Sequence, residues 1–322
     1  MSSAKISIVL SCYNGEKFLE DTIKSVLHQS HSNFTLFLIN NGSIDNSLGI
    51  MKKYEIKDSR IKVINHEVNS SRASRINEVL EIITDRWVAL IDADDIMLKN
   101  KIEVQLAYLN KYPEIKVLGC LATYITSTEK SFGLALNRLE KHNSCFELIR
   151  KGKNIGTPPS GVIMETEVIK KIGGFRGEFW PADDTDLWNR VAENGFIVYA
   201  LPKVLLKYRI HSESFSANKF IEVKIKNEWM NRCLNLRLKN EKEISFDDFY
   251  KNFKKKSFIY KFQFYTKIYS DMYFRKSVKF LVDKKFIIFF YYITLSFFLN
   301  PFRIFLKILQ RIRSLLSTKN NF

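Results

Sequence analysis

The chain has 322 residues, of which 46% are hydrophobic and 26% are charged, and a formal net charge of +17. This length suits one large α/β domain with a further segment of about 100 residues, and the composition excludes disordered and fibrous proteins. Four cysteines lie far apart with no CxxC spacing, which argues against a disulfide framework or a zinc site and favours a reducing compartment.

The first half of the chain alternates between strand and helix patterns. Strands are predicted at Ile6–Cys12, Phe34–Asn40, Ile61–Asn65 and Trp87–Asp92, and amphipathic helices at Glu16–Gln29 and Ala73–Ile83. The apolar part of the first run is too short for the core of a signal peptide, so we expect a cytoplasmic protein. The alternation predicts a mostly parallel sheet flanked by helices, with ligands bound at the carboxyl ends of its strands.

The pattern continues to about residue 215. The expected elements are a helix at Lys101–Tyr112, strands at Val117–Ile125 and Ser160–Met164, a turn at Gly173-Gly174, a helix at Leu187–Glu193 and the segment Val204–His211. We therefore predict one α/β domain over residues 1–215.

The remaining residues, 216–322, are predicted to form a basic and largely helical extension. Residues 212–322 hold 23 Lys and Arg against nine Asp and Glu. The apolar run Phe286–Leu299 is shorter than the 18 to 20 residues or so that span a bilayer, and apolar and basic residues alternate at helical spacing after Pro301. We expect this extension to lie on an anionic membrane surface; an apolar helix packed on the first domain is the alternative.

Two carboxylates follow a predicted buried strand in the triplet Asp92-Ala93-Asp94. Hard oxygen ligands of this kind hold Mg²⁺ or Mn²⁺, which fill the rest of their coordination shell with water and phosphate oxygens. The alternative is a helix cap formed by Asp95, but a cap needs only one aspartate. The triplet therefore predicts a metal site.

A second acidic cluster stands at Asp183-Asp184-Thr185-Asp186. Neighbouring carboxylates raise one another's pKa, which keeps a base available near neutral pH. The cluster equally suits the acidic first turn of the helix that follows it, where negative charge stabilises the helix dipole. Spacing alone leaves both interpretations open.

Six motifs carry a resemblance to a known family. In chain order they are Ser7–Asn14, Asn41-Gly42-Ser43-Ile44-Asp45, Ile91–Asp95, Gly173-Gly174-Phe175, Ala182–Trp188 and Tyr208-Arg209-Ile210-His211. In order and spacing they resemble the bacterial family 2 inverting glycosyltransferases of GT-A fold, over about residues 4–215. The resemblance implies a Rossmann-like GT-A catalytic domain.

The resemblance also implies which residues bind the donor. Ser11, Tyr13 and Asn14 match the loop that frames the donor base, and Asp92 matches the aspartate near the ribose. Asn40 stands where relatives commonly place an aspartate that accepts a hydrogen bond from uracil. Asparagine keeps a carbonyl acceptor, so a UDP-sugar is the expected donor.

The remaining roles concern the metal and the base. Asp94 matches the ligand of Mn²⁺ or Mg²⁺, and His211 matches a histidine near the diphosphate or metal. Asp184 matches the general base. Ser70-Ser71 replaces the glycine usual before the third helix; Arg72 and Arg75 beside it either reach the diphosphate or, as we favour here, are solvated cations on a helix face.

The function implied is an inverting transfer from a nucleotide-sugar donor to a hydroxyl of a glycan or lipid-linked acceptor. Surface polysaccharide synthesis on the inner face of the cell membrane is the expected setting. Transfer to a polyprenyl phosphate is an alternative. A processive synthase is not expected, because its Gln-x-x-Arg-Trp signature is absent.

A rival of another class is a basic nucleic-acid-binding protein, prompted by the net charge and by the mixed Lys, Phe and Tyr residues of 250–261. The chain carries no recognised motif of that class. We therefore expect no nucleic-acid partner. A sugar-binding scaffold without activity would lack the base or the metal ligand, and both are present.

Overall fold

The computed structural model describes residues 4–135, 141–157, 160–211, 220–282, 284–302 and 304–305. The chain divides into two compact units, one of residues 1–214 and 226–243 and the other of residues 215–225 and 244–322. Residues 226–243 thus pack with the first unit. The predicted functional domains, 1–215 and 216–322, stay a prediction.

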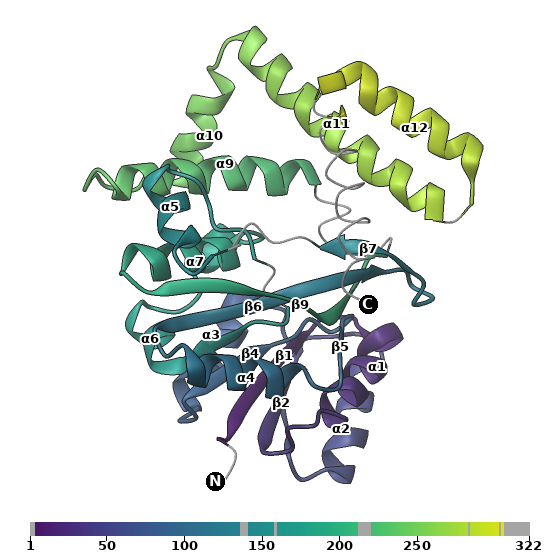
Figure 1. Cartoon of the computed structure of the whole chain (residues 1–322), viewed down its shortest axis with the longest axis vertical. Coiled ribbons are helices and arrows are strands. Elements are labelled where there is room, and N and C mark those ends of the chain that lie inside the picture. The colour runs from purple at the N-terminus through teal and green to yellow at the C-terminus, as the bar shows by residue number, and fades with distance from the viewer. Residues whose placement is uncertain are drawn as a thin grey trace. The chain divides into compact units, whose positions relative to one another are not determined.

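The first unit is built on a nine-stranded sheet with the order β3-β2-β1-β4-β8-β6-β9-β5, in which β7 also pairs with β6 (Figure 1). Six strands run in one direction and β5, β7 and β8 run in the other. The strands are β1 Ile6–Cys12, β2 Phe34–Asn41, β3 Ile61–His66, β4 Trp87–Leu90, β5 Ile96–Met97, β6 Ile115–Ile125, β7 Ser131–Ala135, β8 Ile163–Glu165 and β9 Ile197–Arg209. The predicted mostly parallel α/β fold is confirmed.

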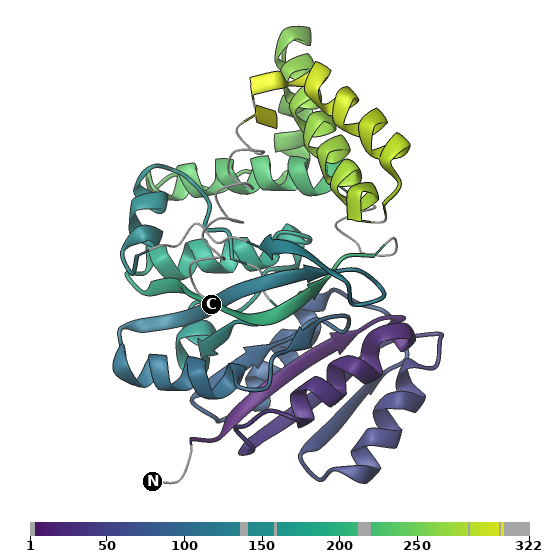
Figure 2. The ribbon, with the colours of Figure 1, turned by 45° about the vertical axis from the view of Figure 1, so that its right-hand side comes forward.

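Helices cover both faces of this sheet (Figure 1, Figure 2). Their bounds are α1 Glu16–Leu27, α2 Ser47–Lys57, α3 Arg72–Ile82, α4 Lys101–Lys111, α5 Ser144–Arg150, α6 Thr166–Lys171, the 3₁₀ turn η1 Gly177–Phe179 and α7 Asp183–Glu193. Side chains alternate across β1, so that Ile8 and Leu10 join the core under α1, α2 and α4, while Val9 joins the core under α3, α5, α6 and α7. Burial on both faces explains why these strands are continuous apolar runs.

Two predicted boundaries are wrong in ways that affect the site. Strand β4 ends at Leu90, two residues before the predicted end at Asp92, and the Asp95 amide donates to the Asp92 carbonyl in a tight turn. Helix α7 begins at Asp183 and not at Leu187. The acidic pair therefore belongs to the first helical turn, where the helix dipole favours negative charge.

The second unit is helical, which confirms the helical extension. Helix α9, Phe220–Arg237, begins in this unit, and α10 Phe246–Lys254, α11 Phe258–Val282 and α12 Phe286–Leu299 follow. Ser270 Oγ donates to the Ser296 carbonyl at 2.9 Å and Ser296 Oγ to the Ser270 carbonyl at 2.6 Å, which joins α11 to α12. The helix predicted after Pro301 lies mostly outside the described residues.

Among the helices that the structure describes, none combines the length and apolar character needed to cross a bilayer. The prediction from the length of the run Phe286–Leu299 agrees with this finding.

One cation of the first unit is fully buried. The Lys101 side chain at the start of α4 has an exposed fraction of 0%, and its Nζ donates to Gln105 Oε1 at 2.6 Å. Gln105 Nε2 in turn donates to the carbonyls of Leu118 and Gly161. Burial lowers the pKa of Lys101 to about 8.

We expect stability to rise less between pH 7 and pH 10 in the Lys101→Met variant than in the wild type. The wild-type lysine binds its proton less tightly when folded than when unfolded, so the free energy of unfolding rises as the pH increases from about 8 to about 10.5. Chemical denaturation at pH 7 and pH 10 measures this rise. If the free energy of unfolding rose equally in the variant, the lowered pKa of Lys101 would be contradicted.

Candidate functional site

The loops that follow β1 and β2 are joined by the Asn14 side chain. Asn14 has a positive φ of 53°, its Oδ1 accepts from the Ile44 amide at 2.9 Å, and its own amide donates to Ser43 Oγ at 3.1 Å. Tyr13 beside it is 52% exposed, while Ser11 is only partly buried at the end of β1. An exposed ring on a braced loop suits contact with a flat base. The framing of the donor base that the resemblance implies for these residues stays a prediction.

The two asparagines at the end of β2 are buried and shape the neighbouring loops. Asn40 Oδ1 accepts from the Ser43 amide at 3.2 Å and its Nδ2 donates to Asn65 Oδ1 at 2.8 Å. Asn41 exchanges two hydrogen bonds with the backbone of Ser70. Since a carbonyl oxygen carries two lone pairs, Asn40 can still accept one further donor. A contact of Asn40 with the base stays a prediction.

Arg72 and Arg75 are not solvated cations, and our preferred interpretation of them is wrong. Their side chains are only 15% and 13% exposed. Arg75 Nε donates to Asn41 Oδ1 at 2.9 Å and its Nη2 donates to the Val68 carbonyl at 2.8 Å, so Arg75 holds the loop before α3.

Arg72 stands between the two acidic clusters. Its Nη2 donates to Asp92 Oδ1 at 2.9 Å, and it interacts electrostatically with both Asp183 and Asp184. Burial nevertheless raises the pKa of Asp92. The loop after β4 and the start of α7 therefore converge on one partly buried guanidinium, which sequence reasoning did not anticipate.

Asp94 and His211 lie side by side, as the resemblance implies. Asp94 Oδ2 and His211 Nε2 are 2.9 Å apart, and the His211 ring packs against the Phe18 ring with centroids 4.8 Å apart. The Arg209 guanidinium covers the same Phe18 ring at 4.5 Å and donates from Nε to the Asp94 carbonyl at 2.8 Å. The end of β9 thus positions the loop that carries Asp94.

The side chains of Asp94 and His211 suit a divalent cation as ligands. The Asp94 carboxylate is 31% exposed and adjoins the His211 imidazole, and carboxylate is the ligand type that suits Mn²⁺ and Mg²⁺. Within the described parts of the chain, no group of three or more His, Cys, Asp or Glu side chains is arranged to hold a metal. The remaining ligands would then be water and diphosphate oxygens, as is usual for Mg²⁺.

Asp95 is a structural residue. It is 1% exposed, its Oδ1 accepts from the Arg209 amide at 2.9 Å, and burial, followed by the charges of Asp94 and Asp92, raises its pKa well above the usual value. Its contact with β9 explains why a third aspartate follows the Asp92-Ala93-Asp94 triplet.

Asp183 and Asp184 open helix α7. Asp183 is 1% exposed, and Asp184 is partly buried. Burial, followed by the charge of Asp183, raises the pKa of Asp184 to about 7. Burial also raises the pKa of Asp183. A carboxylate that titrates near neutral pH is suited to accept a proton from an alcohol.

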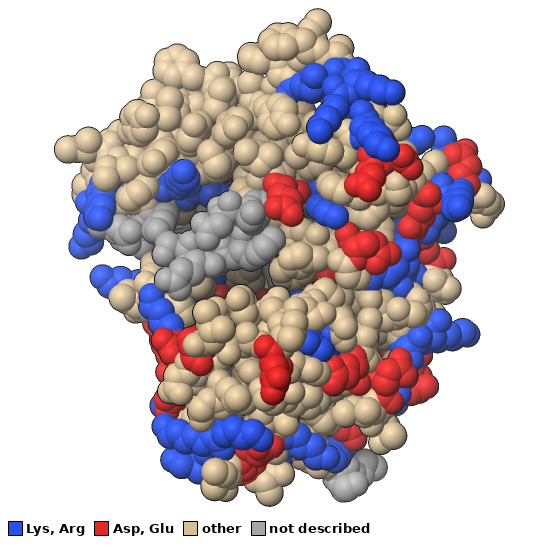
Figure 3. Space-filling view, turned by 180° about the vertical axis from the view of Figure 1, so that it is seen from behind, with Lys and Arg blue, Asp and Glu red and all other residues tan. Residues whose placement is uncertain are grey.

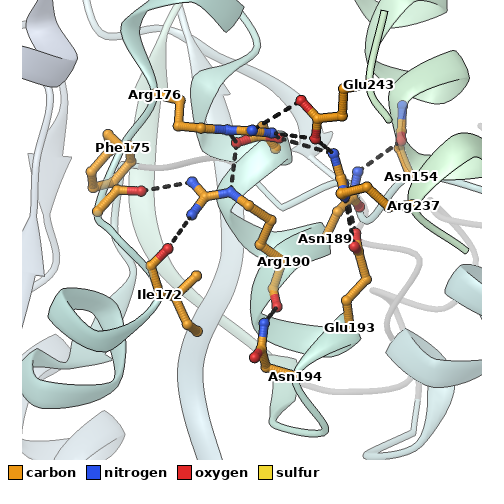
Figure 4. A network of polar contacts seen from close by, with 12 residues as sticks. Asn154, Ile172, Phe175, Arg176, Asn189, Arg190, Glu193, Asn194, Arg237 and Glu243 are labelled. Atoms are coloured by element: carbon orange, nitrogen blue, oxygen red, sulfur yellow. Dashed lines mark hydrogen bonds and ion pairs between the residues drawn. The ribbon is translucent and has the colours of Figure 1, made fainter. Parts of the chain in front are cut away.

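Asp186 has a different role from the other acids of its cluster. Its side chain is fully buried and accepts hydrogen bonds from Nε and Nη2 of Arg176 and from Nε of Arg190. Figure 4 labels these two arginines. Arg190 also donates to the carbonyls of Ile172 and Gly174. This ion-pair network therefore fixes the first turn of α7 to the Gly173-Gly174 turn.

The same network extends to the segment 226–243. Arg237 pairs with both Glu193 and Glu243, and Glu243 also pairs with Arg176 (Figure 4). Burial alone would raise the pKa of Glu243. The guanidiniums of Arg176 and Arg237 nevertheless hold this pKa below its usual value. The rings of Phe179 and Trp229 stack 4.2 Å apart in the same unit. The segment is thus built into the support of the acidic pair.

The Gly173-Gly174-Phe175 motif is explained by Asn77 of α3. Gly174 has a φ of +63°, and a Cβ atom there would lie 2.6 Å from Asn77 Oδ1. Asn77 binds both the amide and the carbonyl of Phe175. Glycine is required at position 174 so that α3 can clamp the turn that leads to α7.

We expect the Arg237→Ala variant to be destabilised by about 2 kcal/mol, because the partly buried Glu193 loses its arginine and Glu243 loses one of its two. Arg232→Ala, an exposed arginine on the same helix, is the matched control and should change stability little. Urea denaturation of both variants measures the difference. Equal stability of the two variants would show that the network does not support the first unit.

The fold and the placement of these acids define the GT-A class of α/β proteins. The chain is similar to Staphylococcus aureus TarS 1–349 in complex with UDP-GlcNAc, with a TM-score of 0.57, 16% identity and 90% of each chain covered. It is also similar to the mannosyltransferase PcManGT of Pyrobaculum calidifontis, in complex with GDP-Man and Mn²⁺, with a TM-score of 0.54, 13% identity, and 75% of this chain and 66% of that chain covered. These likenesses establish the fold.

The family follows from the sequence comparisons. Residues 7–171 match the model of glycosyl transferase family 2. The glycosyltransferase EpsE of Bacillus subtilis is 30% identical over 224 residues, 68% of this chain and 78% of that protein. Escherichia coli WfgD, a UDP-Glc:α-D-GlcNAc-diphosphoundecaprenol β-1,3-glucosyltransferase, is 26% identical over 70% of this chain and 84% of that protein. The chain belongs to glycosyl transferase family 2.

Proposed function

We propose that this glycosyltransferase moves a sugar from a UDP-sugar to a hydroxyl of a lipid-linked glycan, with inversion at the anomeric carbon. The observation that carries the proposal is the convergence of the loop after β4 and the start of α7 on Arg72. We infer that Asp94 of this loop is the metal-binding aspartate and that Asp184 of α7 is the base, the two groups that the transfer requires.

The proposed donor site consists of the loops after β1, β2 and β4. Tyr13 stacks on the base, Ser11 and Asn14 frame it, and Asn40 accepts a hydrogen bond from it. Asp92 lies near the ribose. The names of two similar proteins support a uridine donor, since WfgD takes UDP-Glc and TarS 1–349 was solved with UDP-GlcNAc.

The proposed chemistry is a single displacement. Asp184 removes the proton from the acceptor hydroxyl. At the same time the oxygen of this hydroxyl attacks the anomeric carbon from the side opposite the leaving diphosphate. Asp94 and His211 would hold Mn²⁺ or Mg²⁺, which supplies positive charge for the departing diphosphate. Because a neutralised diphosphate leaves without a proton, no second acid is required.

The proposed acceptor and location follow from the relatives and the extension. WfgD acts on a diphosphoundecaprenol-linked sugar, and the second unit of this chain is basic and rich in exposed apolar residues. We therefore propose a surface-polysaccharide enzyme on the inner face of the cell membrane, with anionic lipid as its partner. A polyprenyl phosphate acceptor would use the same donor site without a general base.

We expect Asp184→Asn to reduce transfer about 100- to 10,000-fold while donor binding persists, because the amide cannot accept the proton. Assays with a UDP-sugar and a diphosphoundecaprenol-linked acceptor measure transfer, and titration calorimetry measures binding. The variant should be at least as stable as the wild type at pH 8, since a raised folded pKa means that the ionised carboxylate opposes folding there. Full activity of the variant would exclude Asp184 as the base and favour an anionic acceptor.

We expect the pH dependence of kcat/KM to report the surroundings of Asp184. In the wild type the rate should fall as the pH drops through about 7, because the base becomes protonated. Asp183→Asn removes a like charge and should shift this fall to lower pH. Arg72→Met removes an opposite charge and should shift it to higher pH. If both variants shifted the fall of kcat/KM in the same direction, the assignment of Asp184 as the titrating base would be contradicted.

We expect Asp94→Ala to weaken Mn²⁺-dependent donor binding by at least about tenfold, because it removes a metal ligand. Calorimetric titration of UDP-, GDP- and dTDP-sugars with and without Mn²⁺ tests this and identifies the nucleotide. Asp21→Ala, on the outside of α1, is the control. Metal-dependent binding that survives in Asp94→Ala would place the metal elsewhere.

A further inference from the structure

Helix α12 presents an exposed apolar surface. Its 14 residues, Phe286–Leu299, include no charged side chain. Six large apolar residues of this helix are at least half exposed, and we call them the apolar face of α12: Phe286 55%, Ile287 88%, Phe290 62%, Tyr291 60%, Phe297 50% and Phe298 79%. At the start of α11, Phe258 and Ile259 are also exposed. Apolar surface gathered in this way marks an interaction site.

The packing of α12 on α11 leaves this face uncovered. The contacts with α11 use other residues: Ser296 exchanges hydrogen bonds with Ser270, and the Tyr292 ring stacks on Tyr273 and Phe280 at centroid distances of 5.9 and 5.5 Å. The helix is thus fixed along one side, and the opposite side meets solvent. A helix of this length is also too short to cross a bilayer.

The charges around this face favour an anionic lipid surface as its partner. Lys284 and Lys285 directly precede α12, and Lys254, Lys255 and Lys256 lie just before α11. Residues 249–302 hold 11 lysines and arginines against two aspartates. Figure 3 shows large uncharged areas of the surface, with Lys and Arg side chains gathered in groups. Apolar residues bordered by cations fit the acyl chains and anionic headgroups of a lipid leaflet.

A second copy of this chain fits the same face less well. Two copies that met through α12 would both present the excess of cations counted in residues 249–302, and like charges oppose such an association. An anionic leaflet satisfies both features at once, because it takes up the apolar side chains and neutralises the lysines.

We propose that α12 inserts its apolar face into one leaflet of an anionic membrane and lies parallel to the membrane plane, with Lys284 and Lys285 at the level of the phosphates. This inference deepens the membrane association in the proposed function and rests on it. It assigns the anchoring to apolar insertion of α12, in addition to attraction between charges.

Site-specific labelling of the full chain tests the insertion. All four native cysteines are buried, so a cysteine introduced by Ile287→Cys or Phe298→Cys can be labelled selectively with the environment-sensitive dye NBD. Ile56→Cys is the matched control, because Ile56 is 87% exposed on α2 of the first unit. Vesicles of equal parts phosphatidylcholine and phosphatidylglycerol, with and without doxyl-labelled acyl chains, are the probe.

We expect the dye at positions 287 and 298 to be quenched by the doxyl chains and the dye at position 56 to be unaffected. Binding of unlabelled protein should persist at about 1 M NaCl, where the Debye length is only about 3 Å. Ile287→Glu should weaken vesicle binding about tenfold or more, because a charge enters the apolar region, and Ile56→Glu should not weaken it.

Three results would overturn the proposal, and each has a different meaning. If salt abolishes vesicle binding and the doxyl chains do not quench the dye, the proposed membrane association stands but the insertion of α12 is rejected. Absence of vesicle binding by the wild type rejects both, while transfer to a soluble acceptor analogue still tests the catalytic proposal separately. A dimer in light scattering that Ile287→Glu dissociates would show that a second copy covers α12.

Discussion

The site depends on the Arg72 guanidinium, which allows several carboxylates to be gathered at one edge of the sheet. Asp92 pairs with it directly, and Asp183 and Asp184 lie within its electrostatic reach. Like charges in a partly buried place repel strongly unless a cation compensates for them. These acids come together because the loop after β4 and the start of α7 both meet Arg72, the first residue of α3. The resulting balance leaves Asp184 with a pKa near neutrality.

The position of the proposed base depends in turn on contacts far along the chain. Asp186 is held by Arg176 and Arg190, and Arg237 connects this group to the segment after the sheet. A buried carboxylate that has three arginines near it fixes the first turn of α7, which carries Asp184. Residues 226–243 therefore support this turn although they follow the last strand of the sheet.

Sequence patterns predicted the parts of this structure that depend on local periodicity. The strands β1 to β3 are apolar runs bounded by polar turns, and they are close to their predicted bounds. The roles of Arg72 and Asp186 could not be predicted in this way, because a charge on a helix has the same local pattern whether it is solvated or paired with a distant residue. The i, i+4 spacing of Asp186 and Arg190 was the only signal of the buried network. The assigned roles of Asp94, His211 and Asp184 stay predictions about chemistry.

The configuration of the product tests the proposed single displacement, because a base opposite the leaving diphosphate permits only inversion. The measurement is proton NMR of the anomeric signal of the sugar transferred from an α-linked UDP-sugar to a diphosphoundecaprenol-linked acceptor. We predict a β-linked product, which should form at least about 100-fold more slowly with Asp184→Asn than with the wild type. An α-linked product would contradict a single displacement and, with it, the role given to Asp184.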